Sequence, residues 1–87
     1  MEMEVITRKG FDELFNEWLQ GEKLSDIKIM LMKAYAKERY KLAKQMLNKI
    51  KKVKRVEEAE KYLKALNVAI YDYIDAKQKL TVMGKWR

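Results

Sequence analysis

A long segment without a helix breaker is the feature that most constrains this chain. The protein has 87 residues and no proline, and its glycines are Gly10, Gly21 and Gly84, so that residues 22–83 contain neither breaker. Lysine, leucine, alanine, glutamate and methionine are frequent in that segment, and all five favour helices. We therefore expect long helices rather than a sheet.

A short amphipathic helix is predicted at about 8–20. Its apolar side chains recur at the spacing of one helix face, at Phe11, Leu14, Phe15, Trp18 and Leu19. Gly21 follows directly, and glycine is the usual residue at a helix C-terminus. This segment is thus expected to end before residue 22.

Two long helices are predicted after it, at about 26–53 and 57–80. Ser25 precedes the first of them and is a favourable N-cap. The apolar stripe of 26–53 meets only charged residues beyond Val53, and it resumes from Ala59 about half a turn out of phase. We therefore place a tight connection near residues 54–56, which makes the two helices an antiparallel hairpin.

These segments predict an all-α fold, a three-helix bundle in one domain covering residues 1–87. The long helices are about 40 Å in length, roughly twice the length of the first helix, so the first helix can cover only about half of the hairpin. A homodimer would cover the exposed remainder. Residues 1–7 and 84–87 are predicted to be flexible ends, and a weak alternation leaves open a pairing of residues 1–7 with 80–87 as strands.

The net charge of +7 is distributed unevenly along the chain. Residues 1–26 carry seven acids and three bases, residues 27–55 carry one acid and eleven bases, and residues 56–87 carry five acids and six bases. The excess positive charge therefore lies in the helix predicted at 26–53.

Within that helix the cations recur on one face, opposite the main apolar stripe. The predicted basic face consists of Lys33, Lys37, Lys41, Lys44, Lys51, Lys52 and Arg55. One interpretation is a solvated face that keeps the protein soluble. A second is a row of charge that follows a phosphate backbone, and a third is a surface that binds an acidic protein. Because lysine predominates, contact with a backbone is favoured over the recognition of bases.

A second group of residues predicts a protein interface. Ile27, Met30, Leu31 and Ala34 lie off the main apolar stripe, so the start of this helix is apolar almost all round and is expected to be buried on several sides. Arg39 projects among apolar residues, where a charge needs a partner. We expect it to form an ion pair with Asp72 or Asp75 or to extend its charged end to the edge of the apolar face, or else to contact a partner at the interface.

Several classes of function are disfavoured by what the sequence lacks. It contains no cysteine and no histidine, which excludes the usual zinc sites and the Ser-His-Asp and Cys-His catalytic groups. No phosphate-binding glycine motif occurs. We therefore expect no enzyme activity, no catalytic residues, no metal and no cofactor. No apolar run is long enough to span a membrane, and a cytoplasmic location is expected.

The sequence therefore predicts a small helical binding protein with a regulatory or accessory role, of a kind common in viral and prokaryotic genomes. The first hypothesis is binding of DNA or RNA to the basic face with little sequence specificity. The alternative is a protein–protein interaction module, an adaptor or inhibitor, that acts through the apolar start of the second helix and the open groove of the hairpin.

Overall fold

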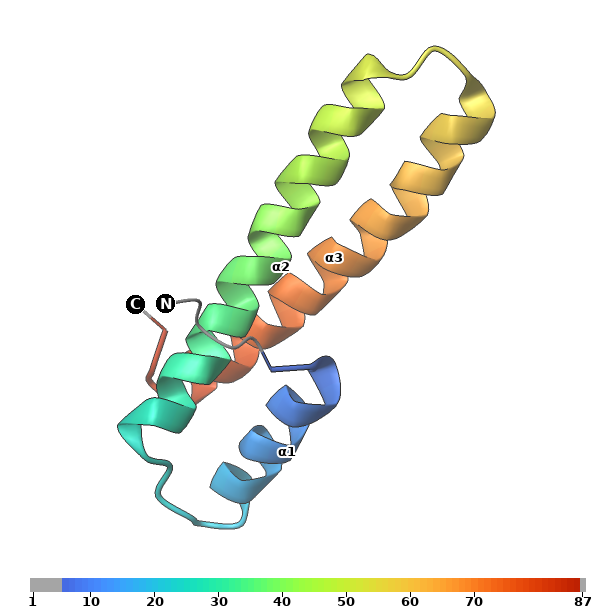
Figure 1. Cartoon of the computed structure of the whole chain (residues 1–87). Helices are drawn as coiled ribbons and strands as arrows, with labels where there is room; N and C mark the ends of the chain where they lie inside the picture. Colours follow the sequence, from blue (N-terminus) through green and yellow to red (C-terminus); the bar gives the residue numbers. More distant parts are fainter. Residues whose placement is uncertain (1–5, 87) are drawn as a thin grey trace.

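The computed structural model describes residues 6–86, and within this range it contains three α-helices and no strand (Figure 1). Helix α1 spans Arg8–Leu19, α2 spans Asp26–Lys52 and α3 spans Val56–Val82. The molecule is elongated, with dimensions of 50 × 28 × 21 Å. Helices α2 and α3 pack against each other as a long hairpin. The predicted all-α architecture of three helices is therefore confirmed.

Local hydrogen bonds explain where the helices begin and end. The Thr7 hydroxyl accepts a bond from the Gly10 backbone N–H at 3.0 Å, and the Ser25 hydroxyl accepts one from the Lys28 backbone N–H at 3.3 Å. Both caps satisfy N–H groups that have no partner within the helix. After α1, Gly21 has a φ of 92°, a conformation that glycine adopts without a steric penalty.

The end of α3 settles one question that the sequence leaves open. Residues 80–82 belong to the helix, and the Met83 backbone N–H still donates to the Lys79 carbonyl at 3.1 Å. A strand at residues 80–82 is therefore wrong, because their backbone groups are used within α3. Residues 1–5 and 87 lie outside the described part of the chain. Of the ends that are described, Ile6 and Trp86 pack against the core.

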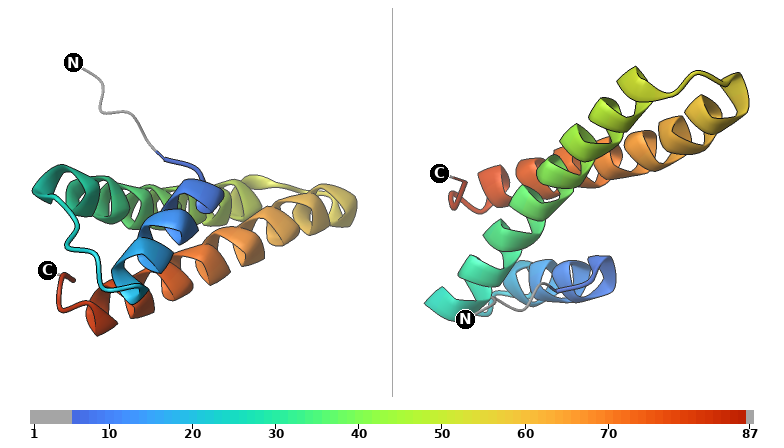
Figure 2. Two further views of the ribbon diagram at one scale, coloured as in Figure 1. Left: turned by 90° about the horizontal axis from the view of Figure 1, so that it is seen from below. Right: turned by 45° about the horizontal axis from the view of Figure 1, so that its top comes forward.

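The core lies at one end of the hairpin, where α1 crosses it (Figure 2). The Phe11 and Tyr35 rings have their centroids 5.0 Å apart and join α1 to α2. The buried residues around them come from all three helices and the segments that flank them, and they are Phe11, Leu24, Met32, Tyr35, Ala36, Ala76, Leu80 and Met83. Among the described residues, this cluster is where the hairpin receives a third layer, from α1.

In the other half of the hairpin, the part of the chain that the structure describes provides two helices and no third layer. No residue of the segment 44–68 is buried, and the apolar side chains of Leu47 and Leu63 are 45% and 43% exposed. Helix α1 is 12 residues long and the hairpin helices are 27 each. The expectation that the first helix covers only part of the hairpin is therefore correct.

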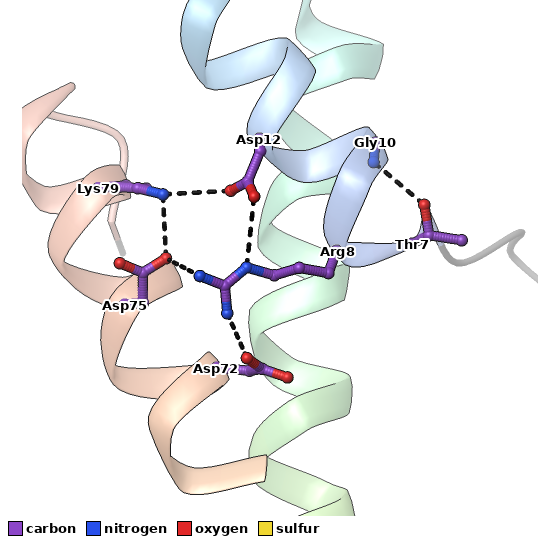
Figure 3. Close-up of polar contacts among 7 residues, drawn as sticks. All are labelled: Thr7, Arg8, Gly10, Asp12, Asp72, Asp75 and Lys79. Carbon is purple, nitrogen blue, oxygen red and sulfur yellow. Dashed lines mark hydrogen bonds and ion pairs between the residues drawn. The ribbon is translucent and has the colours of Figure 1, made fainter. Parts of the chain in front are cut away.

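A network of charged side chains joins α1 to α3 (Figure 3). Arg8 bonds to Asp12 on its own helix and to Asp72 and Asp75 on α3, the Asp75 distance being 2.9 Å. The Lys79 ammonium lies 3.1 Å from Asp12 and 3.0 Å from Asp75. The network closes on itself, so each cation is shared by carboxylates of both helices. It holds α1 across the face of α3 beside the core.

Candidate nucleic-acid interface

The outer face of α2 carries the predicted cations in a solvent-exposed row. Lys37, Lys44 and Lys51 are spaced by seven residues, so they recur on one side of the helix about every 10.5 Å. All three are exposed, as are Lys41, Lys52 and Arg55. The row therefore follows α2 from its middle to the connection with α3.

These exposed cations have no carboxylate partner within residues 6–86. The ion pairs in that part of the chain are made by Arg8, Lys28 and Lys79. Those three cations lie at the α1 end of the molecule and use Asp12, Glu17, Asp72 and Asp75 as partners. The positive charge of the α2 row is therefore uncompensated by ion pairs, and an external anion would be attracted to it.

Two members of the predicted basic face differ from the rest. Lys33 is half-buried, unlike the exposed lysines that follow it along α2. The Lys44 ammonium lies 5.1 Å from the centroid of the Tyr40 ring, a cation–π contact that steadies its long side chain. Tyr40 in turn contacts Tyr73 of α3, with ring centroids 5.1 Å apart. The basic row therefore lies next to the aromatic contact between α2 and α3.

The row ends at an open cavity at the tip of the hairpin. The cavity has a volume of about 470 Å³ and is lined by Lys49, Lys52, Val53, Lys54, Arg55, Glu58 and Tyr62. Four of these seven residues are cationic and one is acidic. The tip is therefore a hollow whose walls are mainly cationic.

The predicted protein interface is partly exposed in the single chain. Ile27 and Met30 are 70% and 54% exposed, and Leu31 and Ala34 are half-buried. The expected burial of this segment on several sides stays a prediction about a partner, because α1 and α3 cover only the opposite side of α2. An apolar patch of these residues remains on the surface, and Met30 and Ala34 line a small hollow together with Lys33 and Lys37.

The expected ion pair of Arg39 with Asp72 or Asp75 is wrong. Both carboxylates bind Arg8 instead, because α1 inserts its first turn beside them. Arg39 is half-buried, its guanidinium carbon lies 5.5 Å from the centroid of the Tyr35 ring, and its Nε is buried without a hydrogen-bond partner. It is held by a cation–π contact rather than by a carboxylate.

Reasoning from the sequence misses the roles of Arg8 and Trp86. Asp72, Asp75 and Lys79 share one face of α3, and Arg8 and Asp12 share one face of α1. These two mixed-charge faces are the signal that could have indicated contact between the helices. Trp86 is half-buried, and its ring centroid lies 6.2 Å from that of Tyr73. It therefore packs on the hairpin.

Residues 6–86 contain no group of three or more metal-ligating side chains placed to hold an ion. Asp12, Asp72 and Asp75 are engaged by Arg8 and Lys79 instead. None of the helices in the same range has the length and apolarity needed to cross a membrane.

Comparison with known proteins finds no match among protein-family models, curated proteins or solved structures.

Proposed function

We propose that this protein binds nucleic acid through the exposed cations of α2, with little dependence on sequence. The observation that carries the proposal is the row from Lys37 to Arg55, in which the exposed side chains have no carboxylate partner within the described chain. The phosphate backbone of DNA or RNA would neutralise this charge and release bound counterions. Lysine is a compact point charge that contacts phosphate without a fixed geometry.

The shape of the row also suits a linear polyanion. Lys37 and Lys52 are separated by 15 positions of one continuous helix, which corresponds to about 22 Å. A straight helix presents its cations along a line, and among residues 6–86 the acidic side chains that form ion pairs lie at the other end of the molecule. A polyanion is thus attracted to one face only.

The test is a binding titration with generic single-stranded and duplex oligonucleotides. If about five lysines contact phosphates, affinity should fall on the order of several hundredfold between about 50 and 200 mM salt. The variant Lys37→Glu, Lys41→Glu, Lys44→Glu should lose binding at low salt. Circular dichroism should show unchanged helicity, because these side chains are exposed.

A matched control separates a local effect from the change in net charge. Lys9, Lys61 and Lys64 are exposed lysines outside α2 and in no ion pair within residues 6–86. Their replacement by glutamate alters the net charge equally and should leave binding within about threefold of the wild type. If the unaltered protein ignores both oligonucleotides at low salt, or if the two triple variants behave alike, the proposal is wrong.

We also propose that two copies associate through the hairpin face that is turned away from α1. Leu63 and Ile70 lie on the side of α3 opposite Asp72, and they are 43% and 39% exposed. On α2, Leu47 is likewise 45% exposed. A second copy offers the same apolar surface and would supply the layer that this half of the hairpin lacks.

The oligomeric state tests this association directly. Sedimentation over a range of concentrations should reveal a dimer, and Leu63→Asp with Ile70→Asp should yield a folded monomer. A wild-type protein that remains monomeric at the highest concentration contradicts the proposal.

The surface patch at the start of α2 favours a second candidate function, binding of another protein as an adaptor or inhibitor. Ile27 and Met30 are exposed large apolar side chains, and Met30 lines the hollow that also includes Lys33 and Lys37. An acidic partner with an apolar anchor would fit both features. Met30→Asp should abolish such a complex and leave nucleic-acid binding intact.

A further inference from the structure

We infer that the cavity at the hairpin tip binds the terminal phosphate of a nucleic-acid strand that lies along α2. This assignment rests on the proposed function, because it concerns where the end of the same nucleic-acid strand binds on the protein. The tip is formed by the last turn of α2, by the connection at residues 53–55 and by the first two turns of α3. A strand that follows the basic row towards the connection would reach this cavity last.

The cations of the cavity come from two successive parts of the chain. Lys49 and Lys52 belong to α2, whereas Lys54 and Arg55 belong to the connection. None of the four makes an ion pair with a described carboxylate, including Glu58 in the same wall. Cations that approach an anion from different directions can surround it, which a single straight row cannot do.

This arrangement suits a chain end better than an internal phosphate. An internal phosphodiester carries one negative charge, and its chain must leave the site on both sides. A terminal phosphate carries a charge of about −1.5 to −2 at pH 7 and offers more acceptor oxygens. The cavity of about 470 Å³ has room for the terminal phosphate and its sugar.

Two further residues that line the cavity, Tyr62 and Glu58, affect how it binds an anion. The Tyr62 ring is half-buried, and the Lys49 ammonium lies 5.6 Å from its centroid, so this contact restrains the lysine in the cavity wall. Glu58 is the only acid among the lining residues, and it opposes the binding of an anion. Removing its charge should therefore strengthen the selection of a phosphorylated end.

The experiment compares oligonucleotides of one sequence that carry a 5′-phosphate, a 3′-phosphate or no terminal phosphate. At moderate salt, one of the phosphorylated strands should bind about tenfold more tightly than the unphosphorylated strand. The variant Lys54→Gln, Arg55→Gln should lose this preference. Arg55 makes no side-chain capping bond, so its replacement should leave the start of α3 intact. Circular dichroism checks that the fold is retained.

A matched variant in the basic row distinguishes the role of the tip cavity from the role of the row in binding. Lys37→Gln with Lys41→Gln should weaken the binding of every strand and keep the preference for the phosphorylated end. Glu58→Gln should increase that preference. Inorganic phosphate at the concentration of the oligonucleotide should leave it unchanged.

The outcomes separate this inference from the function on which it rests. If no strand binds, the proposed function fails and the inference fails with it. If all three strands bind equally well, the function stands and the terminal-phosphate site is wrong. If equimolar inorganic phosphate abolishes the preference, the cavity binds free phosphate, and the assignment to a strand end is overturned.

Discussion

The guanidinium of Arg8 donates a hydrogen bond of 2.9 Å to the carboxylate of Asp75, across 67 positions of the chain. A second bond from the same guanidinium reaches Asp72, one turn earlier on α3. Because one planar group binds two carboxylates of the other helix, both the position and the rotation of α1 are specified. The apolar contact of Phe11 with Tyr35 holds α1 to the hairpin, and Arg8 defines where it lies.

Replacing Arg8 by glutamine should lower the free energy of unfolding by about 1–2 kcal/mol, because Asp72 and Asp75 lose a shared cation in a partly exposed setting. Urea unfolding followed by circular dichroism measures this change. Arg55→Gln is the control, since Arg55 is exposed and unpaired within residues 6–86, and it should alter stability by less than about 0.5 kcal/mol. Equal changes in the free energy of unfolding for the two variants would show that the ion-pair network does not stabilise the fold.

The Tyr35 hydroxyl should be dispensable. The residue is 2% exposed, and its hydroxyl oxygen is buried without a hydrogen-bond partner. Tyr35→Phe keeps the ring contacts with Phe11 and Arg39 and removes an unsatisfied polar atom. Its free energy of unfolding should therefore be unchanged or higher by up to about 1 kcal/mol. A loss of more than about 1 kcal/mol would mean that a bound water or another group satisfies the hydroxyl.

Stability should fall at alkaline pH. Partial burial lowers the pKa of Lys79, but the hydrogen bonds and charges of Asp75 and Asp12 outweigh this effect, so its pKa is raised. Burial also raises the pKa of Tyr35, and the negative charge of Asp72 adds to this rise. For both groups the folded state holds the proton more tightly than the unfolded state, which stabilises the fold below the ordinary pKa values of about 10.

This stabilisation should be complete below about pH 9 and should disappear as pH rises through the ordinary and then the raised pKa values. Urea midpoints between about pH 8 and 12 measure the decline. The Tyr35→Phe variant should show a shallower decline because it has one group fewer to titrate there. A midpoint that stays constant across this range would contradict the raised pKa values.

Helix boundaries follow from local chemistry, and for this reason they could be predicted. Ser25 and Gly21 mark the start of α2 and the end of α1 through hydrogen bonds and a φ value that concern only neighbouring residues. The shift in phase of the apolar stripe after Val53 likewise requires two helices rather than one. The observed connection lies at residues 53–55, within one residue of its predicted place.

The exposure of the basic row could also be predicted, because it depends only on helical periodicity within α2. The ion-pair partner of Asp72 could not be predicted from the sequence, since it depends on where α1 crosses α3. Arg39 and Arg8 are both compatible with that carboxylate by charge, and only the placement of α1 selects Arg8. The exposure of Ile27 has the same origin, because it depends on which side of α2 the other two helices cover.

Two glycines should respond to alanine in opposite directions, although both lie at the ends of α1. Gly10 is inside the helix, and an added Cβ would make ordinary contacts of 3.4 Å with the Ile6 Cβ and 3.5 Å with the Thr7 Oγ1. Gly10→Ala should therefore raise the free energy of unfolding by about 0.5–1 kcal/mol, because alanine loses less backbone entropy in a helix.

Gly21 has open space around its Cα but a φ of +92°, which L residues rarely adopt. Gly21→Ala should lower the free energy of unfolding by about 1–2 kcal/mol, and Gly21→Asn should lower it less, because asparagine tolerates the left-handed region. Thermal and urea unfolding of the three variants supply the comparison. If Gly21→Ala were as stable as the wild type, the left-handed turn after α1 would not be required, and the chain could leave the helix by another path.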